Sequence, residues 1–267
     1  MRRPGPRHAC RGRSRVPGRR SGPVARREEN AVTQKDGRDS LRAYRDKRHF
    51  DRTSEPRGDQ PDRGDQPGRG ERKDTTRAEG DEPAFVVQIH DARTMHFDFR
   101  LEVDGVLKSW SVPKGPSTDP HDKRLAVPTE DHPLAYQDFE GVIAPGEYGG
   151  GTVMVWDRGT YRPTSHDRKD RPVPFAEALD HGHATFELHG DKLHGQYALT
   201  RFHSREEREG TSGAKPTWLL VRTGAGRGGG GTPDPRRARS ARSGRTLRQI
   251  AEAPDAETWD PDGGDTG

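Results

Sequence analysis

The segment from Met95 to Val112 constrains the fold of this chain most strongly, because it has the pattern of a β-hairpin. MHFDFRLEV alternates apolar and polar residues, Asp104-Gly105 is a two-residue turn signal, and VLKSWSV alternates again. Side chains along a strand point to opposite faces in turn, and residues opposed across such a turn share a face. The expected core face holds Phe97, Phe99, Leu101, Val103, Val106, Trp110 and Val112, and the polar face holds His96, Asp98, Arg100, Glu102, Ser109 and Ser111.

Other segments of the same kind follow along the chain. We expect strands at AFVVQIH, GTVMVWDRGTY and TWLLVRT, a second hairpin at ATFELHGDKLHGQYALTRF and a short helix at PFAEALDHG. Many short strands joined by turns predict a mainly β domain, built as an antiparallel barrel or sandwich with a few short helices.

Composition divides the chain into regions. Only 27% of residues are hydrophobic and 34% are charged, so the whole chain cannot bury enough apolar surface to fold as one unit. We predict a compact core over 83–223, flanked by a disordered basic arm over 1–40 and a disordered tail over 224–267. Residues 57–82, which repeat GDQP, are expected to be a low-complexity linker, and 41–56 a segment anchored on the core. The candidate anchors are Leu41, Tyr44 and Phe50.

Charge and cysteine content limit which partners, which kinds of site and which cellular compartment we expect for this chain. The net charge of +4 and the pI of about 9.3 permit a polyanionic partner, although GC-rich coding would also enrich arginine. The single cysteine, Cys10, excludes an internal disulfide and a cysteine-based zinc site. Without a signal peptide or a membrane-spanning run, we expect a cytoplasmic, nucleoid-associated protein with no membrane partner.

Two histidines and a carboxylate are predicted to converge at one end of the hairpin. His90 ends the preceding strand, and a turn through DART would bring it beside His96, with Asp98 next on the same face. This set of ligands suits Mn²⁺, Fe²⁺ or Zn²⁺ and leaves positions open for water or substrate. The alternative is a polar, half-exposed outer face of the sheet.

Five polar residues downstream are candidates for phosphate chemistry. Lys114 and Arg124 are suited to bind phosphate oxygens, and Glu130 to hold a cation in place. His132 is a candidate to stabilise a transition state or to protonate a leaving oxygen, and Tyr136 to donate to a phosphate. Each also fits an ordinary surface or core role. GEYGGGT lacks the ending of a nucleotide P-loop and is expected to be a tight turn entering a strand. The other histidines expected to be surface or structural include His166, His181, His183 and His189.

Two long runs together resemble a known family. FVVQIHDARTMHFDFRLEVDGVLKSWSVPKGPSTDPHDKRLAV and EDHPLAYQDFEGVIAPGEYGGGTVMVWDRGTY are closely similar to the 3′-phosphoesterase domain of bacterial DNA ligase D, which also occurs as a free-standing protein. The resemblance implies a compact β-barrel that uses Mn²⁺. It implies removal of a terminal ribonucleoside from a DNA 3′ end and then of the remaining phosphate, in non-homologous end joining.

The resemblance also assigns roles to residues of this chain. His90, His96 and Asp98 match the metal ligands, and Arg100 and His132 match the phosphate-contacting pair. Further active-site positions are matched by Lys114, Arg124, Glu130 and Tyr136, and by Arg48 and Glu55 in the segment 41–56. The family's arm usually reads Arg-Asp-Phe, whereas this chain has His49 in place of the aspartate.

The expected partners and the rival functions follow from these assignments. The substrate would be a primer-template ending in a 3′-ribonucleotide or a 3′-phosphate, with ligase, polymerase and end-binding proteins as separate chains. One alternative is a DNA-end binder without catalysis, in which His49 marks a decayed site. Another is an Fe²⁺ oxygenase that uses His96, Asp98 and His132 as its two-histidine, one-carboxylate set.

Overall fold

The computed structural model describes residues 40–58, 82–202, 216–224 and 234–253. The predicted basic arm up to residue 39, residues 59–81 of the predicted linker and Cys10 lie outside these ranges. None of the helices in the described part of the chain has the length and apolar character needed to cross a membrane.

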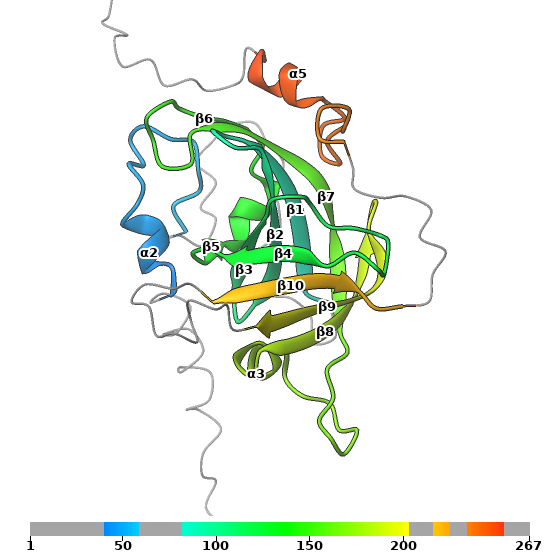
Figure 1. Cartoon of the computed structure of the whole chain (residues 1–267). Coiled ribbons are helices and arrows are strands. Elements are labelled where there is room, and N and C mark those ends of the chain that lie inside the picture. The colour runs from blue at the N-terminus through cyan, green and yellow to red at the C-terminus, as the bar shows by residue number, and fades with distance from the viewer. Residues whose placement is uncertain (1–39, 59–81, 203–215, 225–233, 254–267) are drawn as a thin grey trace, which may run out of the picture.

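The described residues form ten strands and four short helices (Figure 1). The strands are β1 (Ala84–Asp91), β2 (His96–Val103), β3 (Val106–Val112), β4 (Arg124–Pro128), β5 (His132–Pro133), β6 (Gly141–Ile143), β7 (Gly151–Pro163), β8 (His183–Gly190), β9 (His194–Phe202) and β10 (Thr217–Arg222). The helices are α2 (Arg42–Arg45), η1 (Leu134–Asp138, a 3₁₀ helix), α3 (Phe175–Asp180) and α5 (Leu247–Ala251).

Eight of these strands close into an antiparallel barrel. Their order is β1-β2-β3-β4-β10-β9-β8-β7, and β7 pairs back onto β1 to complete the ring. The two short strands β5 and β6 extend this sheet from β3 and β7. The prediction of a mainly β, antiparallel fold is confirmed. Of the two architectures expected from the sequence, the structure is the barrel and not the sandwich. Closure gives each of the eight strands two partners, so no long edge is left open.

The β2–β3 hairpin has the predicted register. Val103 pairs with Val106 and Phe97 with Val112, which requires the two-residue turn. Asp104 and Gly105 have φ values of 50° and 80°, as this type of turn demands. Six of the seven residues on the predicted core face belong to the main hydrophobic cluster inside the barrel, and the seventh, Val106, is also buried.

The opposite face of the hairpin is covered rather than exposed. A second hydrophobic cluster lies on the outer wall of the barrel and consists of Tyr44, Val86, Leu107, Tyr136, Phe139, Ile143, Val153 and Val155, with Phe50 and Leu134 packed against it. The segment 40–58 contributes to this layer, and Leu41 and Tyr44 are buried as predicted. The half-exposed polar face considered from the sequence is therefore wrong, because an outer layer of side chains excludes solvent from it.

The glycine-rich loop before β7 is a tight turn, as predicted. Gly151 has a φ of 144°, and a Cβ atom there would lie 2.3 Å from the backbone oxygen of Asp91. Only glycine allows β7 to begin this close to the end of β1.

The prediction of a disordered tail over 224–267 is wrong for residues 234–253. Helix α5 begins with a capping box formed by Thr246 and Gln249, and Leu247 and Ile250 pack into the main core. Upstream of it, the Ser240 hydroxyl donates to Glu140 over 2.5 Å. Figure 1 shows α5 at the end of the barrel where β6 lies. The segment is ordered by tertiary contacts, since its own sequence offers only two buried apolar side chains on a short helix.

Removing one anchor of α5 tests whether this segment stabilises the barrel. We expect Leu247→Ala to lower the free energy of unfolding by about 2–3 kcal/mol, because it leaves a cavity in the main core. Arg248→Ala is the matched control on the same helix, and its exposed position predicts a change within about 0.5 kcal/mol. Urea unfolding at a fixed temperature measures both, and equal effects would contradict the role of α5.

Candidate active site

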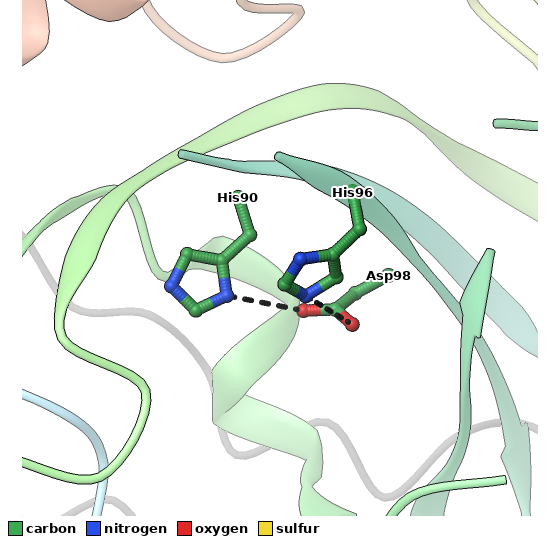
Figure 2. A group of neighbouring side chains, drawn as sticks. All are labelled: His90, His96 and Asp98. Atoms are coloured by element: carbon green, nitrogen blue, oxygen red, sulfur yellow. Dashed lines mark ion pairs between the residues drawn. The ribbon is translucent and has the colours of Figure 1, made fainter. Parts of the chain in front are cut away.

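The predicted metal ligands converge on the outer wall of the barrel. His90 and His96 are directly paired across β1 and β2, and Asp98 follows two residues later on the same face. One side-chain nitrogen or oxygen atom from each residue lies within 4.8 Å of the others. Asp98 Oδ2 is 3.7 Å from His90 Nδ1, and its Oδ1 is 3.6 Å from His96 Nε2. Figure 2 shows the two imidazoles and the carboxylate directed toward one another.

Backbone carbonyls fix which ring nitrogen of each imidazole carries a hydrogen. His90 Nε2 donates to the Gly149 oxygen over 2.7 Å, and His96 Nδ1 donates to the Thr94 oxygen over 2.9 Å. A carbonyl only accepts, so in the metal-binding form of each imidazole it is the other ring nitrogen, which faces Asp98, that carries the lone pair. Metal-binding histidines are oriented in this way by a second hydrogen bond. The three residues therefore fit a divalent transition metal.

Arg100 connects the triad to the rest of the wall. Its guanidinium donates to Asp98 over 3.0 Å, to Gln88 over 2.9 Å and to Ser109 over 2.8 Å. Burial alone would raise the pKa of Asp98, but the charge of Arg100 beside it holds that pKa well below its usual range. Asp98 is therefore an anionic carboxylate, the form that binds a cation.

His132 lies between two arginines. Its Nδ1 is 2.8 Å from Arg100 Nη1, and its Nε2 is 3.3 Å from Arg48 Nη2. Burial, followed by the charges of Arg100 and Arg48, lowers the pKa of His132 well below its usual value, so the imidazole is neutral. A neutral imidazole is a poor proton donor, and both predicted roles of His132, in stabilising a transition state and in protonating a leaving oxygen, stay predictions. The set of His96, Asp98 and His132 considered for an oxygenase is not assembled, because His90 and not His132 completes the cluster with Asp98.

The N-terminal segment completes this network. Arg48 donates to Glu55 over 2.9 Å and to Glu130 over 3.2 Å, and its guanidinium stacks 3.8 Å from the centre of the Tyr44 ring. The Tyr136 hydroxyl donates to Glu55 over 2.9 Å. Burial and then the charge of Glu55 raise the pKa of Tyr136 well above its usual value, so this hydroxyl stays protonated. Tyr136 positions Glu55 in this structure rather than facing outward toward a phosphate.

Lys114 and Arg124 lie at the edge of the site rather than in its buried network. Strand register puts both at the end of the sheet that carries His96, because Val112 pairs with Phe97 and Val127 pairs with Ser111. Lys114 is exposed, and Arg124 Nη2 lies 2.5 Å from Asp122 Oδ2. Their contact with phosphate stays a prediction.

Two residues of the network were missed from the sequence. Gln88 is fully buried, accepts from Arg100, and donates to the backbone oxygens of Tyr136 and Phe139 over 3.1 and 2.9 Å. Its position two residues before His90, on the same face of the strand, was the available signal. Lys47 donates to Glu130 over 3.1 Å, and no sequence pattern marked it.

His49, the departure from the family pattern, lies outside the buried network. Its side chain is 69% exposed, and its Nδ1 is 2.9 Å from Glu147 Oε2. A carboxylate from the glycine-rich loop therefore lies beside the position where the family carries an aspartate.

Comparison with known proteins places this geometry in a family context. Residues 88–201 match the family described as "DNA Ligase D 3'-phosphoesterase domain". The "Multifunctional non-homologous end joining protein LigD" of Pseudomonas aeruginosa is 46% identical over 182 residues, which is 68% of this chain and 18% of that protein. The "Multifunctional non-homologous end joining DNA repair protein LigD" of Mycobacterium tuberculosis is 47% identical over 122 residues, 46% of this chain and 15% of that protein.

These matches cover only a small part of each relative. The chain spans less than a fifth of the length of these relatives. The family match includes the metal triad, Arg100 and His132, but Arg48 and Glu55 precede it.

Metal binding can be tested without measuring catalysis. We expect isothermal titration with Mn²⁺ to show one site, and His96→Ala to weaken it by more than about tenfold through loss of a ligand. His166→Ala is the matched control, because His166 makes the same local contact as His96. Its Nδ1 lies 2.9 Å from the backbone oxygen of Thr164, two residues earlier in the chain. Equal affinity of the two variants would contradict the site.

The buried, neutral state of His132 predicts a pH dependence of stability. Below about pH 6.5 the unfolded chain binds a proton at His132 that the folded chain excludes, so stability falls as the pH falls. Between pH 7.5 and 5.5, with chelator present, the wild type should lose about 1 kcal/mol more unfolding free energy than His132→Gln. Urea unfolding at the two pH values measures this difference, and parallel losses would show that His132 is not held neutral.

Proposed function

Because residues 88–201 belong to the DNA ligase D 3′-phosphoesterase domain family, we propose that this chain is a Mn²⁺-dependent phosphoesterase that processes DNA 3′ ends in non-homologous end joining. The observation that carries the proposal is the convergence of His90, His96 and Asp98 beside the buried Arg100 and His132. It combines a cation site with preorganised positive charge, which is what phosphate ester hydrolysis requires.

The proposed substrate is a primer-template with a 3′-ribonucleotide or a 3′-phosphate. In the first step, water adds to phosphorus, the bond from phosphorus to the 5′-oxygen of the terminal ribonucleoside breaks, and that oxygen takes a proton. In the second step, water hydrolyses the remaining phosphate monoester and leaves a 3′-hydroxyl and inorganic phosphate. Such ends suit extension by a polymerase and sealing by a ligase at chromosomal DNA in the cytoplasm.

The side chains of this protein supply positioning and charge. Gln88, Ser109 and Asp98 hold the guanidinium of Arg100 in one orientation, so its charge is in place before the phosphate arrives. His132 lies against the same guanidinium and offers a neutral, polar contact to the phosphate. When bound to His90, His96 and Asp98, Mn²⁺ would supply Lewis acidity toward the phosphate.

The decisive assay uses a 5′-labelled primer that ends in one ribonucleotide, annealed to a longer template. With Mn²⁺ the wild type should give a shortened product ending in phosphate or hydroxyl, and the product should be absent with chelator and with His96→Ala. Arg100→Gln should lower turnover by about 10²–10³-fold, because it removes the charge that stabilises the transition state. His166→Ala should match the wild type.

The other outcomes discriminate between the rival functions. A product ending only in phosphate would mean that the second step is impaired. The first variant to test would then be His49→Asp, which restores the residue that the family usually carries. No product from folded, metal-loaded protein would contradict catalysis and leave the DNA-end binder as the better account.

A further inference from the structure

A cleft to which no binding role has been assigned so far opens beside the metal triad. It has a volume of about 720 Å³ and lies between the β1–β2 turn, strand β6 and the glycine-rich loop. Ala92 and Arg93 form one side, Val142 and Ile143 another, and residues 145–151 the third. Its volume is in the range of sites that hold small organic molecules.

The wall of this cleft is in direct contact with a metal ligand. The Gly149 oxygen accepts the hydrogen bond from His90 Nε2 over 2.7 Å. A Cβ atom placed on Gly149 would lie 3.6 Å from His90 Cε1, which is ordinary van der Waals contact. A group esterified to a phosphate at the triad therefore lies next to the cleft.

The surface of the cleft suits a flat, largely apolar group. Valine, isoleucine, proline and glycines supply most of its walls. Gly146 and Gly149 have φ values of 92° and 81°, so the loop keeps a backbone surface without side chains at these positions. Tyr148 lines the cleft with 47% of its surface exposed, although Lys47 Nζ lies 4.7 Å from the centre of its ring. Exposed aromatic rings are platforms on which nucleobases stack. Arg93, which is exposed, adds a cation at the rim.

We propose that this cleft binds the terminal ribonucleoside, the leaving group of the first step. The inference rests on the proposed function and adds a subsite to it. A primer ending in a 3′-phosphate has no nucleoside beyond the phosphorus, so only the first step should depend on the cleft. The rest of the DNA strand is common to both substrates, and binding of that strand in the cleft would affect both steps alike.

The first test narrows the cleft. Val142→Phe places a larger side chain on the β6 wall, and Leu125→Phe is the matched control, because Leu125 is 43% exposed on β4 and does not line the cleft. The kcat/KM of each protein is measured on two primers of one sequence, ending in a ribonucleotide or in a 3′-phosphate. Val142→Phe should lower the ratio of the first kcat/KM to the second by about tenfold, and Leu125→Phe should not change it.

A second pair of variants keeps the proposal testable if Val142→Phe does not fold. Tyr148→Phe keeps the ring and removes the hydroxyl that accepts from Lys47 over 3.2 Å, so it is the reference for Tyr148→Ala. Relative to Tyr148→Phe, Tyr148→Ala should lower the same ratio by about tenfold, as expected for one lost base-stacking contact.

The outcomes separate this inference from the function on which it rests. A wild type that acts on neither primer would overturn the proposed function. A wild type that acts on both, with an unchanged ratio in Val142→Phe and Tyr148→Ala, would overturn the nucleoside subsite alone. Equal losses on both primers would also overturn it and would assign the cleft to the shared DNA strand.

Discussion

The buried ion pair between Arg100 and Asp98 is the interaction on which the rest of this structure depends. A guanidinium removed from water costs several kcal/mol unless its charge and its N–H groups are matched. Asp98 supplies the charge, and Gln88 and Ser109 accept two more N–H groups. These partners come from β1, β2 and β3, so the pair requires three adjacent strands in one register. The same pair keeps Asp98 anionic, which links the stability of the wall to its capacity to bind a cation.

Burial of that pair requires an outer layer, and the layer is itself charged. Tyr44 and Tyr136 cover the wall with aromatic rings, while Arg48 is held between Glu55 and Glu130. Each buried charge in this layer has an opposite partner, and a low-polarity surrounding strengthens these interactions. Three carboxylates balance three cations in the described network, namely Asp98, Glu55, Glu130, Arg48, Arg100 and Lys47. A divalent metal would add a positive excess, which suits an anionic phosphate.

Parts of the site followed from local sequence, and parts did not. The order of His96, Asp98 and Arg100 on one face was predictable, because strand alternation and a two-residue turn leave one register. Gln88 obeyed the same rule and was overlooked, although its spacing from His90 was visible. The place of Arg48 in the site came from the family resemblance, and its contacts with Glu130 and His132, some eighty residues away, came only from the tertiary structure. Helix α5 was missed because two apolar residues in an arginine-rich segment carry too weak a signal.

The sequence by itself determined seven of the ten strands of the described residues, the β2–β3 hairpin and the candidate metal ligands, because all three depend on interactions between near neighbours in the chain. Only the tertiary structure decided that β7 pairs back onto β1 to close a barrel, since that choice depends on how whole strands pack. It also decided which side chains cover the polar face of the hairpin. Burial then turned an ordinary histidine, His132, into a neutral partner of two arginines. Desolvation depends on every atom around a group, and no local pattern records it.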